Sequence, residues 1–192
     1  ALMTTGRIVE YRPLSGTYVL PPEHAAFTTA AAGANNMAAF ATFISLFGDV
    51  ESDIVDCFKN GGGVPYSRFG RFQELMAAES RNVSDHALIP TILPIVPGLV
   101  ARLEQGIDVA DIGCGRGHAI NVMARAFPNS RFTGYDFSAE GIAYGRGEAA
   151  DWGLGNATFV EADAATLDVP NSYDLITAFD AIHDQAQPRR VL

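Results

Sequence analysis

The chain has 192 residues, of which 48% are hydrophobic and 18% are charged, a composition typical of a folded globular protein and not of a disordered one. Its formal net charge is −9, from 13 basic and 22 acidic residues, which argues against the basic face that nucleic-acid binding needs and against attraction to anionic membranes. Two cysteines are too few for a disulfide framework or a metal cluster, and no apolar run reaches the roughly 18 residues of a membrane-spanning helix.

The first segment, residues 1–24, consists of short extended pieces. Residues 8–11 and 16–20 are strand-like, and a turn with Pro13 and Gly16 separates them, so we expect a β-hairpin. The N-terminus has no charged-then-apolar signal pattern, and we therefore expect a cytoplasmic protein. The hairpin and the C-terminal end both look severed, and we expect the sequence to be a fragment of a longer chain.

Residues 25–106 are predicted to be mainly helical. Apolar residues recur at three- and four-residue spacing from Met37 to Phe47, with a helix end at Gly48, and a second short helix is expected over residues 51–58. The aromatic and arginine segment 64–72 follows three glycines, which suits a loop that covers a pocket. Two further helices are expected over 72–80 and 84–104, the second bent by its three prolines.

From residue 107 strands and helices alternate. The predicted strands are 107–112, 131–136, 157–161 and 173–179, and the predicted helices are 117–127 and 138–150. This β-α-β-α-β pattern predicts a parallel sheet with right-handed crossovers. We therefore predict an α/β fold with a Rossmann-like doubly wound sheet, of which the first four strands are present.

The most informative motif is Asp111-Ile112-Gly113-Cys114-Gly115-Arg116-Gly117, between a predicted strand and a predicted helix. Such a turn lets a ligand approach the backbone and the N–H groups of a helix N-terminus. The spacing is G-x-G-x-G, with His118 where a dinucleotide fingerprint has glycine. An acidic residue two before the first glycine indicates a ligand with an ammonium group and no pyrophosphate. Cys114 is interpreted as a small side chain in a tight turn and not as a catalytic thiol.

Ligands of open α/β sheets lie at the carboxyl ends of the strands, and acidic residues follow two further predicted strands. Asp136 is suited to accept both hydroxyls of a ribose, although a helix N-cap is the alternative role, which Ser138 could fill instead. Asp163 is suited to accept a hydrogen bond from an exocyclic amine such as that of adenine. The alternative for Asp163 is a solvated loop carboxylate.

The fourth predicted strand would deliver Phe179 and Asp180 beside the glycine turn, and His183 follows about one helical turn later. Histidine can act as a general base near neutral pH. A partly buried histidine bonded to a neighbour is the alternative interpretation of His183.

Together these motifs resemble class I S-adenosylmethionine-dependent methyltransferases over residues 107–184. The resemblance implies that the glycine turn runs under the methionine part of S-adenosylmethionine, that Asp136 holds its ribose, and that Asp163 and the Ala164 N–H contact its adenine. Phe179 and Asp180 would lie near the sulfonium. The implied cofactor-binding residues are Asp111, Gly113, Cys114, Gly115, Asp136, Phe137, Asp163, Ala164, Phe179 and Asp180, with His183 as the catalytic candidate.

The segment from Tyr11 to His24 resembles the wing of a degenerate winged-helix module, which certain bacterial methyltransferases use for dimerisation. The resemblance implies a homodimer and three parts: a wing remnant at 1–24, a helical linker and active-site cover at 25–106, and a partial cofactor-binding domain at 107–192. Tyr66 and Phe69 would wall the pocket of a small-molecule acceptor, although packing between helices is an equal alternative for them.

Two other functions remain open at this point. A nicotinamide-dependent oxidoreductase shares the strand, the glycine turn and the acidic second strand, but His118 weighs against it. A non-catalytic or regulatory winged-helix protein, either one that binds S-adenosylmethionine or one that binds DNA, is the other alternative.

Overall fold

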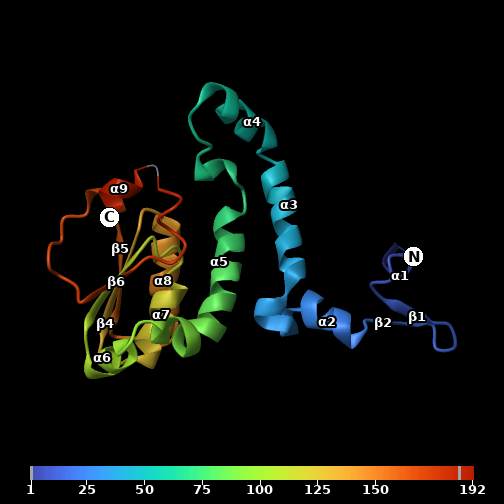
Figure 1. Ribbon diagram of the computed structural model, residues 1–192, viewed down its shortest axis with the longest axis horizontal. Helices are drawn as coiled ribbons and strands as arrows, with labels where there is room; N and C mark the ends of the chain where they lie inside the picture. Colours follow the sequence, from blue (N-terminus) through green and yellow to red (C-terminus); the bar gives the residue numbers. More distant parts are fainter. Residues whose placement is uncertain (1, 186) are drawn as a thin grey trace. The chain divides into compact units, whose positions relative to one another are not determined.

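The computed structural model describes residues 2–185 and 187–192, in two compact units, Ala1–Leu75 and Met76–Leu192. The first unit contains α1 (Leu2–Thr5), β1 (Glu10–Arg12), β2 (Thr17–Val19), α2 (Pro22–Thr28), η1 (Ala30–Asn35), η2 (Met37–Phe40), α3 (Ala41–Gly48), α4 (Glu51–Asn60) and η3 (Tyr66–Arg68). Then follow α5 (Phe72–Val83), η4 (Ser84–Ile92), η5 (Leu93–Ile95), α6 (Leu99–Gln105), β3 (Asp108–Ile112), α7 (His118–Ala126), β4 (Arg131–Asp136), α8 (Ala139–Asp151), β5 (Ala157–Glu161), η6 (Ala164–Thr166), β6 (Leu175–Thr177) and α9 (Pro188–Val191) (Figure 1).

The first unit begins with the predicted hairpin. β1 and β2 pair antiparallel with Tyr11 opposite Tyr18, and the two rings lie 5.1 Å apart between centroids. Pro22 stands at the start of α2, where a residue without an N–H costs nothing. The helices predicted before and after Gly48 are present as α3 and α4. Gly61 follows α4 at φ 76°, a left-handed conformation that ends a helix and favours glycine.

The second unit begins inside α5, whose helix continues into a π-helical stretch, η4, and then into η5. The single bent helix expected over 84–104 is instead broken between Ile95 and Leu99, with a bend of 107°. Pro97 explains the break, because the residue before a proline favours extended geometry, and Val96 has φ −91° and ψ 111°. Pro90 and Pro94 lie within η4 and η5. Within residues 2–185 and 187–192, no single helix is long and apolar enough to cross a membrane, and only this bent pair passes on length and composition.

The sheet has the strand order β5-β4-β3-β6, and all three neighbouring pairs are parallel. This confirms the α/β prediction of a Rossmann-like sheet. The fourth strand is shorter than the predicted 173–179, since it pairs with β3 only over Leu175–Thr177, and Asp180 further along has a left-handed φ of 56°. Helices α7 and α8 pack against β4 and β5 (Figure 1).

The hydrophobic core of the second unit lies between the sheet and these helices. Its largest fully buried side chains include Leu88, Leu103, Ile120, Met123, Phe132 and Ile142. Because α7 and α8 each begin just after a strand ends, this packing holds the carboxyl ends of β3 and β4 next to two helix starts. That edge of the sheet is where the glycine turn lies.

Phe159 of β5 fills the space that two glycines leave open. A Cβ at Gly117 would overlap Phe159 Cε1, and a Cβ at Gly145 would lie 2.8 Å from the same atom. Gly117 also has φ 71°. The third glycine of the turn is therefore required by packing as well as by conformation.

We expect Gly117→Ala to lower the free energy of unfolding by about 2–4 kcal/mol, because left-handed strain and overpacking against Phe159 add. Urea denaturation measures this change. Gly147→Ala is the matched control, since Gly147 lies within α8, where an added Cβ would meet nothing within 4 Å, and the substitution should be neutral or slightly stabilising. Equal stability of the Gly117→Ala protein and the wild type would contradict this account.

Candidate functional site

The glycine turn leaves β3 through three residues in the left-handed region: Gly113 at φ 72°, Gly115 at 56° and Gly117 at 71°. The N–H groups of Gly113 and Cys114 both donate to the carbonyl of Tyr135, at 2.8 and 3.0 Å. These bonds tie the start of the turn to β4. The turn is therefore a rigid part of the sheet edge.

The middle of the turn is open. No atom lies within 4 Å of a Cβ built on Gly115, whereas Gly113 and Gly117 are crowded by neighbours. The Gly115 N–H donates to Asp136 Oδ2 at 2.8 Å. We call this open space above Gly115 the cradle. A ligand can approach the backbone closely there, because glycine has no side chain and Asp136 holds the Gly115 N–H in place.

Asp111 lies beneath this cradle and is only 2% exposed. Thr177 Oγ1 of the neighbouring strand donates to its Oδ1 at 2.8 Å. Burial raises the pKa of Asp111 to about 7; the bond from Thr177 opposes this shift and the charge of Asp136 adds to it. A buried carboxyl of this kind is costly to ionise alone, and a ligand ammonium group would offset that cost.

Asp136 is buried at the end of β4, and both of its carboxylate oxygens accept backbone hydrogen bonds. Oδ2 accepts from Gly115 and Oδ1 accepts from the Ser138 N–H at 2.8 Å. The helix cap is Ser138, whose Oγ accepts from Gly141 N at 3.1 Å. The N-cap role considered for Asp136 therefore belongs to Ser138. Phe137, between them, is 57% exposed.

The third strand end carries Asp163 and Ala164 at the start of η6. Asp163 is exposed, and its Oδ1 caps this short helix by accepting from Ala165 N at 2.9 Å. The Ala162 N–H donates to the Asp136 carbonyl at 2.8 Å, which joins this loop to the end of β4. The two acidic strand ends are thus neighbours.

The fourth strand end lies beside the turn, as predicted. Ala181 Cβ would come within 2.5 Å of a Cβ on Gly113, and Phe179 packs against the hydrophobic core. Asp180 is exposed in a left-handed conformation. The His183 side chain is 64% exposed, with Nδ1 3.6 Å from Asp180 Oδ1 and Nε2 3.4 Å from Asp184 Oδ1. His183 is therefore not the partly buried residue of the alternative interpretation.

Cys114 lies within the glycine turn and is partly buried. Burial raises the pKa of the Cys114 thiol, which opposes formation of a nucleophilic thiolate and agrees with a packing role.

Phe69, in the first unit, is half-buried and its ring centroid lies 5.8 Å from that of Phe72. The Tyr66 side chain lies outside the described parts of the chain. The acceptor-pocket role of Tyr66 and Phe69 stays a prediction.

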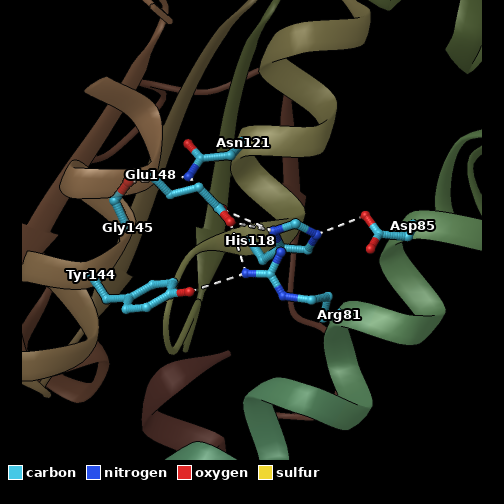
Figure 2. Close-up of polar contacts among 7 residues, drawn as sticks. All are labelled: Arg81, Asp85, His118, Asn121, Tyr144, Gly145 and Glu148. Carbon is cyan, nitrogen blue, oxygen red and sulfur yellow. Dashed lines mark hydrogen bonds and ion pairs between the residues drawn. The ribbon is translucent and has the colours of Figure 1, made fainter. Parts of the chain in front are cut away.

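A charged cluster around His118, at the start of α7, was not predicted from the sequence. Figure 2 shows the His118 ring between acidic side chains from two other helices, with an arginine beside them. The His118 ring contacts Asp85 and Glu148, and the side chains of Asn121 and Arg81 donate to Glu148. The one sign of this cluster in the sequence was His118, directly after the last glycine of the motif. For the described residues, no group of three or more His, Cys, Asp or Glu side chains could hold a metal ion.

Comparison with known families agrees with this geometry. A methyltransferase-domain model matches residues 103–192, and an Rv2258c-like winged helix-turn-helix model matches residues 1–30. Residues 103–192 therefore match the domain of S-adenosylmethionine-dependent methyltransferases. Members of this family use S-adenosylmethionine, and the open cradle, the buried Asp111 and the strand-end Asp136 fit that cofactor.

Curated methyltransferases are also similar to part of this chain. Trans-aconitate 2-methyltransferase of Afipia carboxidovorans is 34% identical over 87 residues, which are 45% of this chain and 30% of the relative. Malonyl-[acyl-carrier protein] O-methyltransferase of Bacillus cereus is 29% identical over 119 residues, 61% of this chain and 38% of the relative. The chain thus spans less than half the length of these relatives.

A solved structure supports the methyltransferase fold over nearly the whole chain. PigF with SAH aligns with a TM-score of 0.63 at 19% identity, covering 98% of this chain and 58% of PigF. A structure from Nostoc punctiforme aligns with a TM-score of 0.62 at 17% identity, covering 91% of this chain and 51% of that one. At these identities the likeness concerns the fold alone.

Proposed function

We propose that the methyltransferase binds S-adenosylmethionine over the Asp111–Gly117 turn and that the whole protein transfers its methyl group to a small-molecule acceptor. The observation that carries the proposal is the open cradle at Gly115 between two buried carboxyl groups, Asp111 and Asp136. When bound, the cofactor supplies a methyl group on a sulfonium for in-line displacement.

The residues of this chain would bind and orient. Asp111 would pair with the ammonium group, and its buried position makes that pairing strong because little water competes. Asp136 would accept the ribose hydroxyls on lone pairs that its two backbone bonds leave free. Asp163 and the Ala164 N–H would meet the adenine, with Gly113, Cys114 and Phe137 lining the cradle.

The fourth strand end would face the reacting group. Phe179 and Asp180 would lie near the sulfonium, and His183 would accept a proton from an acceptor oxygen or nitrogen. The exposure of the His183 ring, beside Asp180 and Asp184, supports this role because an acceptor can reach the ring nitrogens. Tyr66 and Phe69 would wall the acceptor pocket.

The organisation of the whole protein belongs to the same proposal. Residues 1–24 would be part of a winged-helix module that forms a homodimer, residues 25–106 a linker and cover, and residues 107–192 the cofactor-binding part. The winged helix-turn-helix match at residues 1–30 supports the first of these assignments. We place the protein in the cytoplasm. The acidic net charge of −9 does not favour a DNA-binding role for the wing.

Calorimetric titration with S-adenosylmethionine and S-adenosylhomocysteine tests the proposal. We expect binding of both in the micromolar range, about 8 kcal/mol, and no fluorescence change with reduced nicotinamide dinucleotide. Transfer of labelled methyl groups to a panel that includes trans-aconitate and a benzylisoquinoline amine then tests catalysis, since relatives are named for acceptors of both kinds. Binding without any transfer would favour the regulatory alternative. Nicotinamide binding without S-adenosylmethionine binding would overturn the proposal.

A further inference from the structure

His118 is held between two carboxylates from different helices. Nδ1 lies 2.9 Å from both oxygens of Glu148 in α8, and Nε2 lies 2.8 Å from Asp85 Oδ1 in η4. The His118 side chain is 7% exposed, Glu148 10% and Asp85 39% (Figure 2). Water therefore competes little for the contact with Glu148 and only partly for the contact with Asp85.

The proton count at this contact determines the charge of the ring. An ionised carboxylate only accepts hydrogen bonds, so each ring nitrogen that faces one must carry a proton. Only the imidazolium form of His118 carries a proton on both nitrogens. With Arg81, whose guanidinium donates to Glu148 Oε1 at 2.8 Å, the cluster contains two cations and two anions. A neutral His118 would leave a lone pair facing a carboxylate inside the protein.

Other groups around the cluster keep Glu148 ionised. Burial acts to raise the pKa of Glu148, but hydrogen bonds from Asn121, His118 and Arg81 outweigh it and lower that pKa. Arg125 stacks over the Trp152 ring at 4.1 Å, and this ring meets the His118 ring edge-on. The strands beneath α7 contribute apolar side chains, Phe132 and Phe159, to the shared core. Glu148 thus serves both His118 and Arg81, whereas Asp85 contacts His118.

The cluster is joined to the glycine turn at two places. His118 is the residue directly after Gly117 and the first residue of α7. Arg81 also donates to the Tyr144 hydroxyl at 3.3 Å, and the guanidinium of Arg116, within the turn, lies 4.9 Å from the Tyr144 ring. Side chains of α5, η4 and α8 therefore contact the glycine turn on both sides of Gly117, at Arg116 and at His118.

We propose that His118, as an imidazolium between Glu148 and Asp85, is a positioning residue for the cofactor turn, so that the affinity for the cofactor depends on the charge of this ring. The inference rests on the proposed function, because it concerns the same cofactor. It assigns to the helices Phe72–Ile92 a role in shaping the cradle through Arg81 and Asp85, although neither residue lies in the turn.

The test uses the full chain with His118→Gln, Asp85→Asn and the control Arg131→Gln, which removes an exposed ion pair with Asp108 at the amino ends of β3 and β4. Affinity for S-adenosylhomocysteine is measured from about pH 5 to about pH 8, the range over which histidine side chains change charge. Each affinity is divided by that of the control, so the titration of Asp111 cancels. Nitrogen NMR of the His118 ring reports its protonation directly.

We expect His118→Gln to bind about tenfold more weakly than the control at the lower pH, and the difference to shrink as pH rises and the wild-type ring loses its proton. In Asp85→Asn the new amide can donate to Nε2, so a neutral ring is satisfied over the whole range. Because the control keeps the wild-type ring, Asp85→Asn should bind more weakly than the control at the lower pH, and the difference should shrink as pH rises. The wild-type ring should carry two N–H protons at neutral pH and the Asp85→Asn ring only one.

The inference would be overturned if His118→Gln bound as tightly as the wild type at every pH, or if the wild-type ring carried only one N–H proton at neutral pH. Either result would leave the proposed function intact. Failure of the wild type to bind S-adenosylhomocysteine would overturn the proposed function itself. If His118→Gln does not fold, Asp85→Asn carries the same test, because Asp85 is partly exposed. An Asp85→Asn affinity equal to that of the control at every pH also contradicts the inference.

Discussion

Asp136→Ala is expected to weaken S-adenosylhomocysteine binding by at least about 100-fold. The substitution removes the proposed ribose acceptor, and it also removes the acceptors of the Gly115 and Ser138 N–H groups that shape the turn. Hydrogen bonds to a charged group contribute about 1.5–3 kcal/mol each, so the loss of two or more accounts for this factor. Calorimetric titration of the variant and the wild type measures it.

Two controls separate binding from folding. Asp108→Asn changes a carboxylate at the other end of β3 and should leave the affinity unchanged. Asp136→Ala should also lower the free energy of unfolding by about 2 kcal/mol, because two backbone donors lose their partners, and titrations are therefore made well below its melting temperature. An Asp136→Ala protein that binds as tightly as the wild type would exclude Asp136 from the cofactor site.

Asp111→Asn is expected to make the cofactor-free protein more stable at pH 8 than the wild type. The pKa of Asp111 in the folded domain, about 7, lies above its ordinary value of 3.8. Its contribution to stability is therefore full below about pH 4 and is lost as pH rises through about 7. Asp111→Asn has no ionisable group at this position and so avoids the loss. The difference between the folded and ordinary pKa values limits the loss to about 4 kcal/mol. Urea denaturation at about pH 5 and about pH 8 shows whether only the wild type loses stability over this range.

The same carboxyl should link cofactor binding to proton release. An ammonium group beside Asp111 would lower its pKa, so binding near pH 7 should release a fraction of a proton, measurable by calorimetry in buffers of different ionisation enthalpy. Asp111→Asn should bind more weakly and should release no proton from this site. Equal proton release by the variant and the wild type would show that Asp111 does not contact the ammonium group.

The fold of the cofactor half was predictable because its signals are local. Apolar runs that end in Gly113 or in an acidic residue such as Asp136 mark strands that turn into helices, and the predicted bounds of β4 and β5 match the structure. The predicted fourth strand was too long, because the parallel pairing with β3 covers only Leu175–Thr177 and the left-handed conformation of Asp180 is not signalled by the sequence. The break after Ile95 was underestimated, since Pro97 makes Val96 extended and so ends the helix, whereas the helix continues through Pro90.

Local motifs alone were enough to indicate the family and the candidate residues of the cofactor site, because the spacing of three glycines and two carboxylates reflects local backbone geometry. Packing between distant segments was needed to establish which carboxyls are buried, that Ser138 and not Asp136 caps α8, and that His118 joins Glu148 and Asp85. Residues some thirty positions apart meet only when helices pack, and the pKa of Asp111 depends on that packing because burial, not residue type, sets the cost of its charge.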